Sequence, residues 1–112
     1  MEHDPDAYLF DIKRACNEIK EFTRDVSFEE YSRNSLVKAA VERKFLVIGE
    51  AMKRLQREHP DILNKITDHD KIIGFRNVLV HGYDIIDDTT VWSSIKDSLP
   101  TLQREVEDIL GP

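Results

Sequence analysis

Cysteine is almost absent from this chain of 112 residues, in which Cys16 is the only one. A single cysteine cannot form an internal disulfide, which fits a reducing, cytoplasmic location. The chain also lacks the run of roughly 20 apolar residues that a transmembrane helix needs. Its first six residues, MEHDPD, have neither the basic nor the apolar region of a signal peptide. We therefore expect a soluble cytoplasmic protein that does not act at a membrane.

Glycine and proline are scarce, with four of each, and most of them stand at the ends of the predicted segments. No segment alternates apolar and polar residues over a useful length, which argues against strands. The content of 40% hydrophobic and 34% charged residues is typical of a folded helical protein. A mass of 13.1 kDa suits one domain, residues 1–112. We predict an all-α fold, an antiparallel bundle of four to five helices.

The chain has no excess of basic residues. It contains 16 Lys and Arg against 22 Asp and Glu, which gives a net charge of −6. Such a chain does not adhere to nucleic acid through general charge attraction, and we expect no DNA binding. The acidity does not exclude a local basic cleft, and Arg76, Lys71 and Arg43 are candidates to line one.

Local signals place most helix ends. Asp4 and Pro5 suit the start of a helix, and Ser27 with Glu30 matches a capping box. Gly82 is expected to end a helix in the left-handed conformation, and Pro100 to kink or split the last helix. The predicted helical segments are residues 4–25, 28–32, 35–58, 62–66 (a turn or short helix), 68–81 and 87–110.

The segment 35–58 is apolar around more than one stripe, so the helix should be buried on two sides. In so short a chain one side faces the core. We expect the other to form a subunit interface, and hence a homodimer. The charges Glu42, Arg43 and Glu50 on this helix are expected to form salt bridges between helices or subunits.

The segment 72–87 carries the polar residues with the clearest chemical meaning. Arg76, Asn77 and His81 stand among apolar neighbours, and a buried charge requires a partner. Asn77 and His81 are four apart and share a helix face, whereas Arg76 and His81 are about 140° apart. One interpretation is structural, with His81 stabilising the helix end and Arg76 bonded to Asn77. The other is a catalytic site that includes His81. The histidines and acidic residues show no metal-site spacing, so no metal or cofactor is expected.

The segment RNVLVHGY, residues 76–83, resembles the Arg-x4-His motif of HEPN-domain ribonucleases, in the branch of HepT-like toxins. The resemblance extends to the Glu-Arg and Gly-Glu-Ala elements of residues 42–51 and to residues 84–92, and it covers about residues 9–110. It implies a homodimer that cleaves RNA without metal, with Arg76, Asn77 and His81 as catalytic residues in a cleft between subunits.

The resemblance also implies regulation. In HepT-like toxins the tyrosine of Arg-x4-His-x-Tyr, here Tyr83, is similar to the position to which a partner nucleotidyltransferase of the MntA type attaches AMP. Such an addition would bring negative charge into a cleft that admits RNA. Two other interpretations remain. One is a non-catalytic helical module that binds nucleotides or presents a substrate to a nucleotidyltransferase, and the other is a purely structural dimeric bundle.

Overall fold

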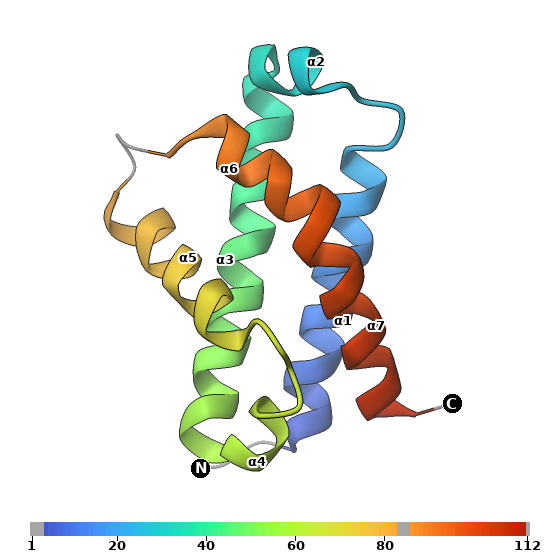
Figure 1. Cartoon of the computed structure of the whole chain (residues 1–112), viewed down its shortest axis with the longest axis vertical. Helices are drawn as coiled ribbons and strands as arrows, with labels where there is room; N and C mark the ends of the chain where they lie inside the picture. The colour runs from blue at the N-terminus through green and yellow to red at the C-terminus, as the bar shows by residue number, and fades with distance from the viewer. Residues whose placement is uncertain (1–3, 83–85, 112) are drawn as a thin grey trace.

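A central helix, α3 (Ser35–Glu58), organises the molecule, and the other helices pack around it (Figure 1). The computed structural model describes residues 4–82 and 86–111, and it has no strand within those ranges. The other elements are α1 (Pro5–Phe22), α2 (Phe28–Arg33), α4 (Pro60–Leu63), α5 (His69–His81), α6 (Asp88–Ser93), a π-helix η1 (Ser94–Ser98) and α7 (Leu99–Leu110). The predicted all-α bundle is confirmed.

The ends of α1, α2 and α3 follow the local signals in the sequence. The Asp4 side chain accepts a hydrogen bond from the Asp6 N–H, and Ser27 and Glu30 form both bonds of the capping box. The Asn34 side chain caps α3 by accepting from the Val37 N–H at 3.1 Å. The first helix ends at Phe22, three residues before the predicted end. There the chain turns through Asp25, whose φ of 58° lies outside helical geometry.

Gly82 does not have the predicted left-handed conformation. Its φ is −117° and its N–H donates to the Val78 carbonyl at 2.7 Å, so α5 ends on an ordinary helical hydrogen bond. Any residue type can adopt that conformation, and the prediction was wrong. The split at Pro100 is confirmed. The π-helix η1 precedes α7. Pro100 lies in the first turn of α7, where a backbone N–H has no partner within the helix, so its absence breaks no hydrogen bond of α7.

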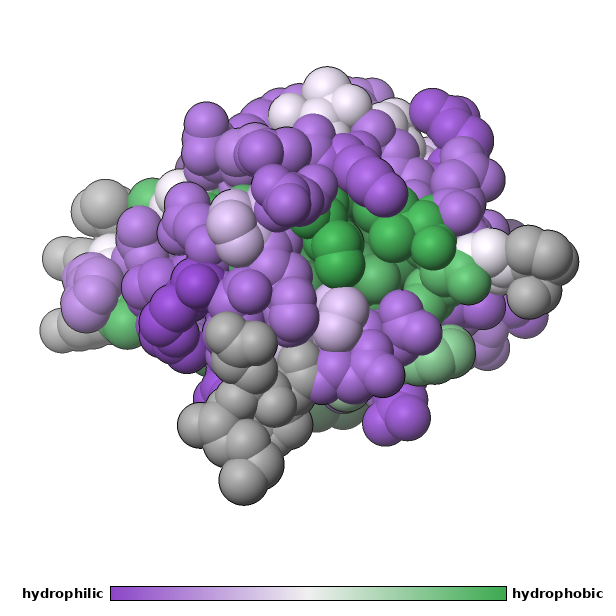
Figure 2. Space-filling view, turned by 90° about the horizontal axis from the view of Figure 1, so that it is seen from below, coloured by the Kyte–Doolittle hydropathy of each residue, from purple (hydrophilic) through white to green (hydrophobic). Residues whose placement is uncertain are grey.

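The core lies between α1, α3 and α7, where the buried side chains include Leu9, Ile12, Ile48, Met52 and Val106. Cys16 is buried among them, as the apolar stripe of its helix predicts. Figure 2, seen from the α4 end, shows hydrophobic residues that reach the surface between hydrophilic ones. No helix among the described residues is long and apolar enough to span a membrane.

The helix α5 contributes little to the core. It packs along α3, and only Ile72 on it is buried. Its Val78 and Val80 remain 40% and 39% exposed. In Figure 1, α5 lies along α3, and the rod formed by α6, η1 and α7 crosses α3. The helix that carries Arg76, Asn77 and His81 therefore rests mainly on one neighbour.

Candidate active site

The contact between α3 and α5 centres on Gly49. A Cβ atom at Gly49 would lie 2.2 Å from Arg76 Cβ and 2.5 Å from Arg76 Cγ, closer than real carbon atoms approach. Only glycine therefore allows α5 to cross α3 at this point. The first carbons of the Arg76 side chain cover the α3 backbone, which directs the guanidinium along the surface of α3.

The guanidinium of Arg76 is held at three of its nitrogens. Nε donates to Glu50 Oε1 at 2.7 Å, and Nη2 donates to the same oxygen. Nη1 donates to Asn77 Oδ1 at 3.0 Å. The Arg76 side chain is 16% exposed and that of Glu50 is 45% exposed, so the pair lies at the edge of the solvent. This confirms the expectation that Glu50 forms a salt bridge between helices.

Three of the five N–H donors of Arg76 are used in these bonds. The remaining donors belong to the two terminal nitrogens. A guanidinium with donors left on its terminal nitrogens can bind an oxyanion, and this is the common geometry for phosphate recognition. Glu50 and Asn77 thus orient the group without using all of its binding capacity.

His81 lies in the last turn of α5 and is exposed. Asn77, one turn earlier on the same face, is also exposed. Among residues 4–82 and 86–111, no hydrogen bond or ion pair joins His81 to Arg76 or Asn77. One chain therefore presents an anchored arginine and an exposed histidine from one short helix, as the helical spacing predicts. Tyr83 lies outside the described residues.

Glu42 and Arg43 are the other two charges that were predicted to support the site. Only Arg43 shares a face of α3 with Glu50. Glu42 is partly buried near the other end of α3, where burial raises the pKa of its carboxyl, Lys38 lowers it and Asp88 raises it. It does not contact Arg76. Arg43 is exposed on α3, two turns before Glu50 on the same face, and it lines a groove that also contains Glu50.

Lys71, the other candidate for a basic cleft, lies away from Arg76. Its Nζ donates to Ser98 Oγ at 3.5 Å across the gap between α5 and η1. It lines a cavity of about 420 Å³ between α5 and the α6–η1–α7 rod. Sequence reasoning missed this cavity. Its apolar lining includes Phe45, Ile72, Phe75, Val78, Leu99 and Leu102.

The described residues contain no group of three or more His, Cys, Asp or Glu side chains that could hold a metal ion. His69 Nδ1 lies 3.2 Å from Asp70 Oδ1, but this pair is at the opposite end of α5 from His81. Arg76, Asn77 and His81 of α5 and Glu50 of α3 thus offer a cation, an amide, an imidazole and a carboxylate, which are groups suited to binding and proton transfer at a phosphate ester.

Comparison with known proteins agrees with this chemistry. A protein of Methanocaldococcus jannaschii named "Putative RNase" is 31% identical over 95% of this chain and 96% of its own length. Another of that name and organism is 34% identical over 97% and 93%. A "Probable ribonuclease HepT" of Thermococcus cleftensis is 31% identical over 97% and 98%. No solved structure matches.

The family model described as "Ribonuclease HepT-like" matches residues 12–109, a range that contains α3, α5 and every residue of the Arg76 site. With relatives at this level of identity over nearly the whole chain, the assignment rests on more than the short motif. The chain belongs to the HepT-like ribonuclease family.

Proposed function

We propose that this chain is a metal-independent endoribonuclease that acts as the toxin of a toxin–antitoxin pair. The observation that carries the proposal is the anchored Arg76, bonded to Glu50 and Asn77, on the same short helix as the exposed His81. In a chain of a ribonuclease family, an oriented guanidinium and an accessible imidazole on one helix supply groups that RNA cleavage needs.

The reaction is an attack of the RNA 2′-oxygen on the adjacent phosphorus. The 2′-O–P bond forms, the P–O5′ bond breaks, and the products carry a 2′,3′-cyclic phosphate and a 5′-hydroxyl. One imidazole takes the proton of the 2′-hydroxyl, and a protonated imidazole gives a proton to the leaving 5′-oxygen. Arg76 binds the phosphate oxygens on which charge accumulates. Asn77 orients Arg76.

A single His81 cannot be acid and base in one turnover unless it moves its proton between the two oxygens. Two chains provide two imidazoles, and this supports a homodimer in which the α5 helices of both chains face one cleft. The hydrophobic side chains left exposed on α5, Val78 and Val80, lie on the helix that such a dimer would cover.

Regulation by AMP addition at Tyr83 belongs to the same proposal. Tyr83 follows His81 by two residues. An adenylate there would add a negative charge and a bulky base to a site that must admit an RNA phosphate. The partner would be a minimal nucleotidyltransferase acting as the antitoxin.

The test is expression of the chain without its partner, followed by growth measurement and RNA analysis. We expect growth arrest and RNA cleavage with the wild type, and loss of both with Arg76→Ala and with His81→Ala. His69→Ala is the matched control, because it removes a histidine from the other end of α5. If His81→Ala cleaves RNA as well as the wild type, the proposal is wrong, and a non-catalytic nucleotide-binding role becomes the better account.

A further inference from the structure

The side of α3 that points away from the core was expected to be apolar and to form a subunit interface, but its centre is charged. The core side carries Val41, Phe45, Ile48, Met52 and Leu55. Counted at about 100° per residue, the opposite side is centred on Glu50. Basic residues gather there. We call this surface the basic face of α3, and its members are Arg43, Lys53, Arg54 and Arg57.

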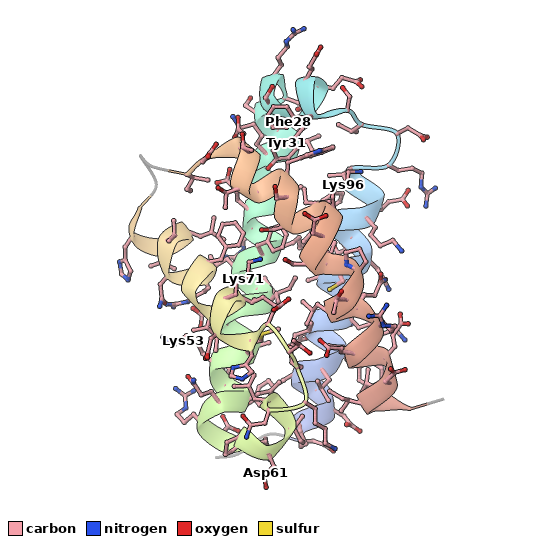
Figure 3. All side chains as sticks on the ribbon, viewed as in Figure 1. Phe28, Tyr31, Lys53, Asp61, Lys71 and Lys96 are labelled. Atoms are coloured by element: carbon pink, nitrogen blue, oxygen red, sulfur yellow. The ribbon has the colours of Figure 1, made fainter. Side chains whose placement is uncertain are left out.

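The basic face runs between the two helices that pack against α3. Arg43, Glu50 and Arg57 are seven residues apart and lie nearly in line along the helix. Lys53 and Arg54 flank that line on either side. Figure 3 shows Lys53 at the outer edge of the bundle, beside α5. The guanidinium of Arg76 reaches this face from α5 through its bonds to Glu50.

Arg43 and Arg57 on this face are not paired in the way that other basic residues of α3 are. Lys38 pairs with Asp88 at 3.0 Å and Lys44 pairs with Glu18 at 3.1 Å. In the part of the chain that the structure describes, no ion pair joins Arg43 or Arg57 to a carboxylate.

The charge of this face is opposite in sign to the net charge of the whole chain. Four basic residues and Arg76 outnumber the three acids that lie with them, Asp11, Glu50 and Glu58, in a chain whose 22 acidic residues outnumber its 16 basic ones. This face is a local reversal of the overall charge, and an anion approaching the protein is directed to it.

A groove follows the same line. It has a volume of about 430 Å³, and it lies between α1 and α3. Arg43, Glu50 and Arg54 are among its walls, and Leu46 and Val47 form an apolar part of its lining. Tyr8 and Asp11 of α1 complete it. Because Glu50 belongs both to this groove and to the Arg76 site, the two are continuous.

We propose that the basic face of α3 binds the sugar–phosphate backbone of single-stranded RNA and leads it to Arg76. This inference rests on the proposed function and names the route by which the substrate reaches the site. Arg43 and Arg57, on opposite sides of Glu50, bind phosphates on the two sides of the scissile one. Leu46 and Val47 contact the apolar parts of the ribose or base.

The dimensions favour one strand over a duplex. Arg43 and Arg57 are about 21 Å apart along the helix axis, and the face is about one helix wide. A single helix face of this width follows one phosphate backbone. A duplex is recognised instead by contacts that span a groove between its two backbones.

The experiment measures binding separately from cleavage. Fluorescently labelled single-stranded RNA of about a dozen nucleotides is titrated with the His81→Ala protein, and the affinity is followed from 50 to 200 mM salt. Arg43→Gln and Arg57→Gln are introduced singly and together. Arg104→Gln is the matched control, since Arg104 is an exposed arginine on α7 outside this face. Circular dichroism confirms that each variant is folded.

We expect each substitution on the basic face to weaken binding several-fold at low salt. It should also reduce the slope of log affinity against log salt by about 0.7, the contribution of one phosphate contact on a single strand. Arg104→Gln should change neither. Equal binding by the Arg43→Gln/Arg57→Gln double variant and the Arg104→Gln control would overturn the inference, as would a preference for duplex RNA.

The two proposals fail separately in this design. If wild-type protein does not cut RNA but the salt slopes change as expected, the inference stands and the proposed catalysis falls. If wild-type protein cuts RNA but the slopes do not change, the catalysis stands and the substrate takes another route. A face that binds an acidic protein instead of RNA would give the second result.

Discussion

Gly49 and Arg76 mark the point where the central helix and the motif helix touch, because a side chain at Gly49 would occupy the space of Arg76 Cβ. The Gly49–Glu50 pair therefore has two roles. Gly49 admits the base of the Arg76 side chain, and Glu50 holds its end. The position of the guanidinium depends on both residues of α3 as well as on α5 itself.

Substitution of Gly49 by alanine should displace α5. The added methyl group would overlap Arg76 Cβ and Cγ, and overpacking of this kind costs about 1–3 kcal/mol. We expect a lower free energy of unfolding in urea and a loss of RNA cleavage. The matched control is Gly74→Ala. Nothing lies within 4 Å of a Cβ at that position in α5, so the variant should be more stable by about 0.5–1 kcal/mol. Equal stability of both variants would contradict the close contact.

Glu50→Ala should reduce the rate of cleavage more than it changes the KM for RNA. Without the carboxylate, Arg76 keeps its charge but loses two hydrogen bonds that fix its direction. Stability should fall by less than about 1 kcal/mol, since Glu50 is 45% exposed and exposed ion pairs contribute little. Glu50→Gln, which retains an acceptor oxygen, should restore part of the rate. Glu29→Gln on α2 serves as the control for the loss of one negative charge. A pure KM effect in Glu50→Ala would show that Glu50 does not orient Arg76 for the reaction.

Local signals explain which parts of this fold could be predicted from the sequence. The bounds of α3 agree with the predicted ones because Asn34 caps one end and Pro60 follows the other. Arg76, Asn77 and His81 stand out because they are polar residues in an apolar segment. Their partner Glu50 is 26 residues earlier in the chain, and its contact depends on how two helices cross. Local rules also fail at Gly82, whose φ of −117° is not the left-handed conformation that they predict.

The thiol of Cys16 should make stability depend on alkaline pH. Burial, and secondarily Glu107, raises its pKa from 9.0 to about 12 in the folded protein. The folded state therefore holds the thiol proton more tightly than the unfolded state does. The stability from this difference is fully present below pH 9 and is lost as the pH rises toward 12.

Urea unfolding between pH 8 and pH 11 measures this effect. Cys16→Ala should have a smaller decrease in unfolding free energy across that range than the wild type. The native thiol should also resist iodoacetamide at pH 8 and react once the chain is unfolded. Rapid alkylation of the folded protein would contradict the buried position of Cys16.

The proposed regulation at Tyr83 makes a prediction about mass. Co-expression with the partner nucleotidyltransferase should add one or more adenylate groups to the wild-type chain, and intact-mass spectrometry detects each addition. Tyr83→Phe should remain unmodified and should remain toxic in the presence of the partner. Tyr8→Phe controls for the loss of a phenol elsewhere. Adenylate on the Tyr83→Phe chain would assign the modification to another residue.

Cleavage of a defined RNA by the purified wild-type protein in excess EDTA tests the central claim most directly. The account predicts fragments that end in a 2′,3′-cyclic phosphate and a 5′-hydroxyl. It predicts no cleavage of the same RNA with a 2′-deoxy residue before the scissile phosphate, and none by His81→Ala. Fragments that end in a 5′-phosphate, or cleavage that requires a divalent cation, would contradict it.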